Sequence, residues 1–79
     1  MCIFFVELIT LEMLQGYWKN NLGTVLEVID NKCITANNDF EILEYEDQFE
    51  MNGWTLMKNS ATIIWSDGAE DIIWIRKVS

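Results

Sequence analysis

The chain reads QFEMNGWTLM over residues 48–57, and this stretch carries its sharpest structural signal. The Asn-Gly pair at its centre stands between two short apolar runs. Asn52 and Gly53 both tolerate the positive φ that a type I′ turn requires. The pair therefore predicts a β-hairpin with strands over 48–51 and 54–57.

Turn-forming residues also recur on both sides of this hairpin. Clusters of Asn, Asp and Gly recur every ~8–12 residues, which is the spacing of strands in an all-β barrel or sandwich. No helical pattern of ~10–15 residues separates these strands, which excludes parallel β-α-β units, and short connections require antiparallel neighbours. The turn signals lie at 20–23, 30–32, 37–39, 52–53 and 67–71.

We therefore predict a single, mainly β domain over residues 1–79. After an N-terminal helix, residues 16–79 form six to seven antiparallel strands in a meander. The sheet is either strongly curved or closed into a small barrel. An open sheet with the helix across one face is the alternative.

Residues 1–15 are predicted to form that N-terminal helix. Phe5, Ile9 and Met13 repeat at helical spacing and make one apolar face. Gly16 then stands at the position where a left-handed residue ends a helix. Leucines on the remaining arc leave this helix apolar nearly all round. We expect it to contact the sheet on one side and a second copy of the chain on the other.

The last predicted hairpin, over residues 61–78, carries large apolar side chains on both faces. Ile63 and Trp65 point to one face, and Ile64 points to the other. A strand that is apolar on both faces is covered on both. The cover is a curled sheet, the helix or a partner chain. In so short a chain this pattern favours self-association, most simply as a homodimer.

The composition excludes several classes of partner. Hydrophobic residues make up 51% of the chain, with four Trp, four Phe and two Tyr, which suffices for a dense core and argues against disorder. A formal charge of −8 repels phosphate backbones and anionic membranes, so we expect no nucleic acid and no membrane partner. The apolar opening, residues 1–6, is too short to cross a bilayer.

No residue pattern indicates catalysis, a metal or a cofactor. Cys2 and Cys33 are far apart and the chain has no His, which argues against zinc and predicts two reduced thiols in a cytoplasmic protein. Asp67, Glu70 and Asp71 lack the spacing of a calcium loop, and turn formation explains them better, although a bound cation stays open. We expect a protein that is not an enzyme and needs no cofactor.

Two short motifs resemble known β-folds. A Gly-x-Trp at 16–18 on the first strand, with Arg76 on the last, resembles the closure signature of calycin-type barrels such as lipocalins. This resemblance implies that Trp18 packs under Arg76 where the first and last strands meet, in a cation–π contact. Trp-Ser-Asp-Gly at 65–68 followed by Trp-x-Arg at 74–76 is similar to the ending of small antiparallel β-modules of protists, which implies a fold but no activity.

The four tryptophans have two interpretations. They are core residues at strand spacing, or they line a groove for a small ligand or a peptide. The first interpretation favours a non-enzymatic protein-interaction or structural module that self-associates. The alternative is a ligand- or peptide-binding module with a tryptophan-lined groove. The candidate ligand or interface residues are Trp18, Trp54, Trp65, Trp74, Arg76, Phe5, Ile9 and Met13.

Overall fold

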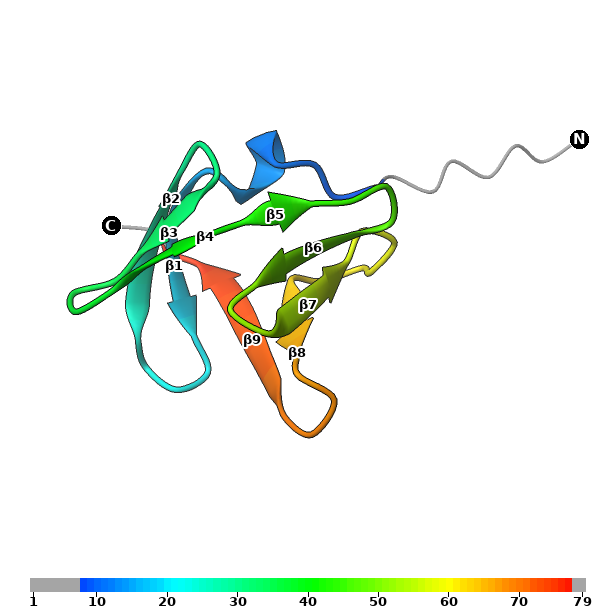
Figure 1. Cartoon of the computed structure of the whole chain (residues 1–79). Coiled ribbons are helices and arrows are strands. Elements are labelled where there is room, and N and C mark those ends of the chain that lie inside the picture. Colours follow the sequence, from blue (N-terminus) through cyan, green and yellow to red (C-terminus); the bar gives the residue numbers. More distant parts are fainter. Residues whose placement is uncertain (1–7, 78–79) are drawn as a thin grey trace, which may run out of the picture.

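The structure is a computed structural model that describes residues 8–77 (Figure 1). Its strands form one antiparallel sheet in the order β4-β3-β2-β1-β9-β8-β7-β6-β5. Neighbours in the sheet are neighbours in the chain, except where the first strand meets the last. The elements are the 3₁₀ turn η1 (Glu12–Leu14) and the strands β1 (Gly16–Asn20), β2 (Val25–Ile29), β3 (Lys32–Ile34), β4 (Asp39–Glu41), β5 (Leu43–Glu44), β6 (Gln48–Met51), β7 (Trp54–Met57), β8 (Ile64–Ser66) and β9 (Asp71–Arg76).

The sheet closes almost completely into a barrel. Its two outer strands, β4 and β5, are consecutive in the chain and separated only by Ile42 (Figure 1). The amide of Ile42 donates a hydrogen bond to the carbonyl of Asn31 at 2.6 Å, and its side chain is buried in the core. One continuous segment thus pairs with β3 through its first half and with β6 through its second. This closure leaves little unpaired strand edge, which opposes edge-to-edge aggregation.

The predicted antiparallel meander and small barrel are confirmed, and residues 8–77 form nine strands rather than the predicted six to seven. The central hairpin is confirmed as well, because β6 and β7 pair along their whole length and φ is 49° at Asn52 and 84° at Gly53. The strand count differs partly because the run 40–45 divides at Ile42. Its two halves must pair with different neighbours to bring the sheet edges together.

The predicted helix over residues 1–15 is wrong where the structure describes it. Residues 8–15 contain only the short turn η1. The amide of Ile9 donates to the carbonyl of Lys58 at 2.8 Å, so the start of this segment bonds to the barrel, and only the amides of Met13, Leu14 and Gln15 donate within the segment's own short turn. Tertiary contacts here override helical spacing. None of the helical structure within residues 8–77 is long and apolar enough to span a bilayer.

The core is one contiguous cluster inside the barrel. Side chains alternate across a strand, so one face of each strand supplies the core and the other faces outward. On the last hairpin the outward residues Ile73 and Ile75 are 39% and 65% exposed. The curled sheet therefore covers only one of the two apolar faces predicted for this hairpin. The buried core residues are Ile9, Leu14, Trp18, Leu26, Val28, Cys33, Ile42, Phe49, Leu56, Trp65 and Trp74.

Candidate functional site

The two ends of the barrel are built differently (Figure 1). The end that carries η1 is termed the closed end, and it comprises residues 9–15, 30–31, 45–47 and 58–63. The opposite end is termed the open end, and it comprises the turns at 21–24, 35–38, 52–53 and 67–70. The side chains at each end decide which of them has room for a ligand.

The core at the closed end is filled by side chains of the chain itself. A more open hollow of about 630 Å³ lies at the surface of this end, and it is lined by Leu8, Glu46, Asp47, Met57, Lys58 and Asn59. Leu14, from η1, is fully buried, and Ile9 is 4% exposed. Next to them, the indole Nε1 of Trp18 donates to the carbonyl of Leu14 at 2.8 Å. The core residues Phe49 and Leu56 are likewise fully buried. The short segment before β1 therefore acts as a plug.

Arg76 seals the closed end from outside. It pairs in register with Trp18 where β9 meets β1, and its guanidinium carbon lies 3.9 Å from a Trp18 ring centroid. Its two terminal nitrogens donate to the carbonyls of Gln15 and Met13. A Cβ on Gly16, whose φ is 106°, would lie 2.9 Å from Arg76 Nη1, so glycine leaves space for the guanidinium. The Trp18–Arg76 contact that the resemblance implied is present.

The open end contains a cavity of about 220 Å³. Its wall is aromatic and aliphatic, and its rim carries hydroxyls and amides. Within the part of the chain that the structure describes, no Asp, Glu, Lys or Arg lines it. The lining residues are Leu26, Cys33, Phe40, Met51, Trp54, Trp65, Ile72 and Trp74 in the wall, with Asn20, Thr24, Thr35 and Asn52 at the rim.

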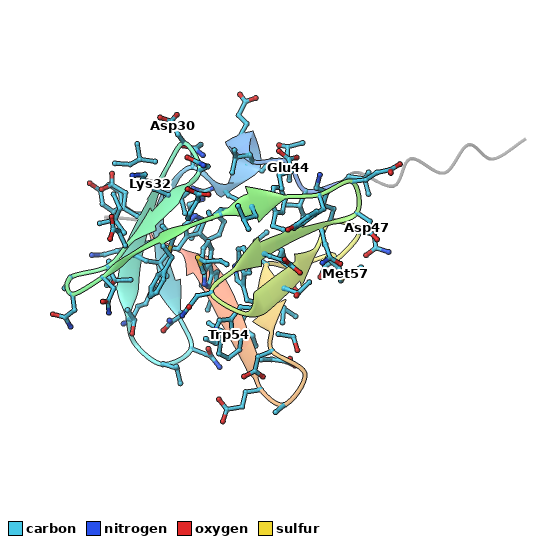
Figure 2. The ribbon with its side chains drawn as sticks, in the orientation of Figure 1. Asp30, Lys32, Glu44, Asp47, Trp54 and Met57 are labelled. Atoms are coloured by element: carbon cyan, nitrogen blue, oxygen red, sulfur yellow. The ribbon has the colours of Figure 1, made fainter. Side chains whose placement is uncertain are left out.

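The four tryptophans divide between the two ends. Trp18 belongs to the closed end, whereas Trp54, Trp65 and Trp74 line the cavity. The ring centroid of Trp74 lies 5.7 Å from that of Trp18 and 5.2 Å from that of Trp65, so Trp74 links the two ends. Trp54 is half-buried beside the β6–β7 turn (Figure 2). Trp65 and Trp74 are thus core residues that also line a cavity, and the two interpretations of the tryptophans overlap.

The three N-terminal candidate residues do not share one described face. Phe5 lies outside the described residues. Ile9 is buried in the core, whereas Met13 is 39% exposed and its carbonyl accepts a hydrogen bond from Arg76. The helical spacing that grouped them in the sequence is not the geometry of residues 8–15.

Apart from the tryptophans, the residues of the cavity wall carry no distinguishing signal in the sequence. Cys33, Phe40 and Met51 line the cavity because each is on the inward face of its strand. Period-two alternation was the available signal, but it does not show where inward side chains leave space. The Cys33 thiol is 1% exposed, and burial raises its pKa to about 11. At neutral pH it is an uncharged, weakly polar part of the wall.

Large apolar side chains also lie on the outside of the barrel. Tyr17 is 55% and Ile75 65% exposed. Lys19 on β1 pairs with Val25 on β2 and with Ile75 on β9, so the outward residues of these strands are contiguous. This surface is termed the outer strip, and it consists of Tyr17, Lys19, Val25, Glu27, Ile34, Ile73 and Ile75.

The acidic β8–β9 loop is organised as a turn. The Asp67 carboxylate accepts hydrogen bonds from the amides of Glu70 and Ala69, at 2.8 and 2.9 Å. These two amides, Glu70 first, hold the pKa of Asp67 below its ordinary value. Within residues 8–77 no group of three His, Cys, Asp or Glu side chains is placed to hold a metal ion, and this covers Asp67, Glu70 and Asp71.

Comparisons with protein-family models, with curated proteins and with solved structures give no match to this chain. Function is therefore inferred from the chemistry of the cavity and of the outer strip. The cavity is the more specific of the two features, because it combines a concave shape, aromatic walls and a polar rim.

Proposed function

We propose that this protein binds a compact, uncharged, largely apolar molecule in the cavity at its open end. The observation that carries the proposal is a space of about 220 Å³ bordered by Trp54, Trp65 and Trp74. Small-molecule sites are typically concave and mostly apolar, with a few polar groups at fixed positions. The hydroxyls of Thr24 and Thr35 at the rim provide such groups.

The volume limits the size of the ligand. A dry cavity of ~150 Å³ holds benzene, and drug-sized ligands occupy ~300–1,000 Å³. A space of about 220 Å³ suits a substituted benzene or a small bicyclic molecule. It is too small for a long lipid chain or for several residues of a peptide. The small-ligand form of the sequence-based alternative is therefore the one that we retain.

The wall favours an uncharged ligand. Burying a charge without a partner is costly, and no charged side chain among the described residues lines the cavity. The net charge of −8 also repels anions from the whole molecule. The faces and edges of three indole rings offer contact surface to a flat apolar molecule.

The closed end supports this proposal because its contacts fix the shape of the barrel without filling the cavity. Arg76 joins β1, β9 and the segment around η1 through its contacts with Trp18, Gln15 and Met13. A barrel that is held rigid at one end can keep an unfilled cavity at the other. From the arrangement of Gly16, Trp18 and Arg76 we propose that the fold is a compact relative of the calycin-type barrels.

Titration with naphthalene, followed by ¹⁵N–¹H NMR correlation spectra, tests the proposal. We expect saturable shifts of the indole resonances of Trp54, Trp65 and Trp74, because their rings border the cavity. Amides of the β6–β7 turn at the rim should move with them. The absence of any saturable shift would contradict the proposal.

Two matched variants of β3 locate the binding. Cys33→Leu adds side-chain volume to the cavity wall, whereas Ile34→Leu changes the next residue, which is 37% exposed on the outside. We expect naphthalene binding to be lost in Cys33→Leu and kept in Ile34→Leu, with folding of both checked by circular dichroism. Equal binding by the two folded variants would place the ligand elsewhere.

Self-association is a second candidate function, favoured by the outer strip. Tyr17 and Ile75 are each more than half exposed there, on the paired strands β1 and β9. The strip also carries Lys19 and Glu27 on adjacent strands, so a two-fold contact between two copies can pair opposite charges. We propose a homodimer through this surface. Both candidates are binding roles rather than catalytic ones.

Size-exclusion chromatography with light scattering tests the dimer. We expect Ile75→Glu to give a monomer, because it replaces the most exposed apolar side chain of the outer strip with a charged one. Leu43→Glu is the control, since Leu43 is 45% exposed on β5, away from the strip. A wild-type chain that stays monomeric at high concentration would rule out this second function and leave the cavity unaffected.

A further inference from the structure

Asn21 continues the pairing of β9 beyond the end of β1. The two strands pair in register as far as Asn20 and Trp74, and β1 ends at Asn20. At the next residue the chain enters the β1–β2 turn, yet the amide of Asn21 donates to the carbonyl of Ile73 at 3.0 Å. The start of this turn is therefore still bonded to β9 at the open end.

The side chain of Asn21 bonds to both peptide groups that flank Ile72. Its Oδ1 accepts a hydrogen bond from the amide of Ile73 at 3.1 Å, and its Nδ2 donates to the carbonyl of Asp71 at 3.4 Å. That carbonyl belongs to the peptide bond before Ile72, and that amide to the peptide bond after it. Because the backbone is held on both sides of Ile72, the direction of its side chain is fixed as well.

Asn21 thereby joins two parts of the cavity lining that come from different elements. Ile72 and Trp74 line the cavity from β9, whereas Asn20 and Thr24 line it from the β1–β2 hairpin. The turn of this hairpin is itself held by Asn20, whose Oδ1 accepts from the amide of Thr24 at 2.9 Å. The hydrogen bonds of Asn21 therefore set the position of the β9 wall relative to the rim.

We infer that Asn21 is a positioning residue for the ligand of this cavity. This inference rests on the proposed function and names a residue that acts through the cavity wall. A site whose wall is already in place binds without the cost of ordering it. Without the Asn21 side chain, the segment 71–73 takes up the binding arrangement for only part of the time. The apparent dissociation constant then rises by the inverse of that fraction.

Alanine substitution of two asparagines at the open end tests this inference by naphthalene titration. Asn21→Ala removes both side-chain hydrogen bonds to β9. Asn38→Ala is the matched control, because the Asn38 side chain makes no hydrogen bond to a described residue and does not line the cavity. We expect Asn21→Ala to raise the dissociation constant about three- to tenfold, the size of one net hydrogen bond, and Asn38→Ala to leave it unchanged. Circular dichroism checks that both variants are folded.

Asn21→Asp separates positioning from a general loss of stability, and it keeps the test valid if Asn21→Ala does not fold. At pH 7 the new carboxylate accepts from the amide of Ile73 but cannot donate to the carbonyl of Asp71. Below the ordinary carboxyl pKa of ~3.9, the protonated group is both acceptor and donor, like the amide that it replaces. Relative to the wild type at the same pH, we expect naphthalene to bind about threefold more weakly at pH 7 and equally well at pH 3. A loss of stability unrelated to these two hydrogen bonds would not be reversed by this proton.

The outcomes separate the inference from the function on which it rests. If the folded Asn21→Ala variant binds naphthalene as tightly as the wild type, the inference is overturned and the cavity remains a ligand site. The same holds if Asn21→Asp is equally weakened at both pH values. If the wild type itself gives no saturable shift, the inference is overturned together with the proposed function.

Discussion

The closed and open ends of this barrel use the same alternating strands, yet the core is filled at the first, whereas an apolar cavity lies between the strands at the second. At the closed end Trp18 is hydrogen-bonded and covered by Arg76. At the open end the N–H of Trp65 has no acceptor among the described residues, and Trp54 is half-buried. The difference comes from η1 and its flanks, which fold over one end, whereas the described residues at the other end form short turns. A short chain thus concentrates these contacts at one end and leaves a cavity at the other.

Truncation of Trp18 should have the largest effect on stability. We expect Trp18→Ala to lower the free energy of unfolding by about 3–5 kcal/mol, because it empties a large buried site and removes the support of Arg76. Trp54→Ala is the matched change at the open end and should cost less than half as much. Urea unfolding measures both. Equal losses of unfolding free energy in the two variants would show that the two tryptophans are equally well packed.

The thiol of Cys33 reports on the packing of the open end. Its pKa of about 11, raised by burial from an ordinary value of 9.0, lowers the thiolate fraction about a hundredfold at neutral pH. In a Cys2→Ser background we expect methyl methanethiosulfonate to react about a hundredfold more slowly than with the urea-unfolded chain. The rate should keep rising as the pH goes from 9 towards 11. A folded rate equal to the unfolded one would mean that the cavity wall is not closed around Cys33.

Removal of the Arg76 side chain measures how much its contacts at the closed end stabilise the fold. We expect Arg76→Ala to destabilise the fold by about 1–3 kcal/mol, through loss of the cation–π contact and of two hydrogen bonds to the carbonyls of Gln15 and Met13. Arg76→Lys should recover only part of this, because an ammonium lacks the forked donor geometry. Thermal unfolding measures the series, with the exposed Lys19→Ala as a control for net charge. An unchanged melting midpoint in Arg76→Ala would show that Arg76 does not stabilise the closed end.

The smallest expected effect concerns the β8–β9 loop at the open end. The pKa of Asp67 is lowered in the folded state, so its contribution to stability is present above its ordinary pKa and lost as the pH falls through the lowered value. Asp67→Ala should therefore reduce the melting temperature slightly at neutral pH and not in strong acid. Asp67→Asn, whose amide oxygen still accepts from Ala69 and Glu70, should be the milder change. A difference that persists in strong acid would contradict a role for the charged form.

Local signals in the sequence were enough for much of the fold. Asn52-Gly53 specifies its hairpin because the required φ values are a property of those two residues. The recurrence of turn residues likewise predicted an antiparallel meander and a small barrel. The contact between Trp18 and Arg76 followed from a resemblance to barrel closure, and the structure contains it. Each of these features depends on a few residues at a fixed spacing.

Long-range contacts were decisive for the remaining features. The apolar segment 8–15 has helical spacing, but the end of the barrel offers Leu14 and Ile9 more burial than an isolated helix would. The run 40–45 divides at Ile42 because both sheet edges need a partner. The cavity arises where inward side chains fail to fill the space between strands distant in the chain. Residue order establishes which side chains point inward, whereas the volume between them depends on how all nine strands come together.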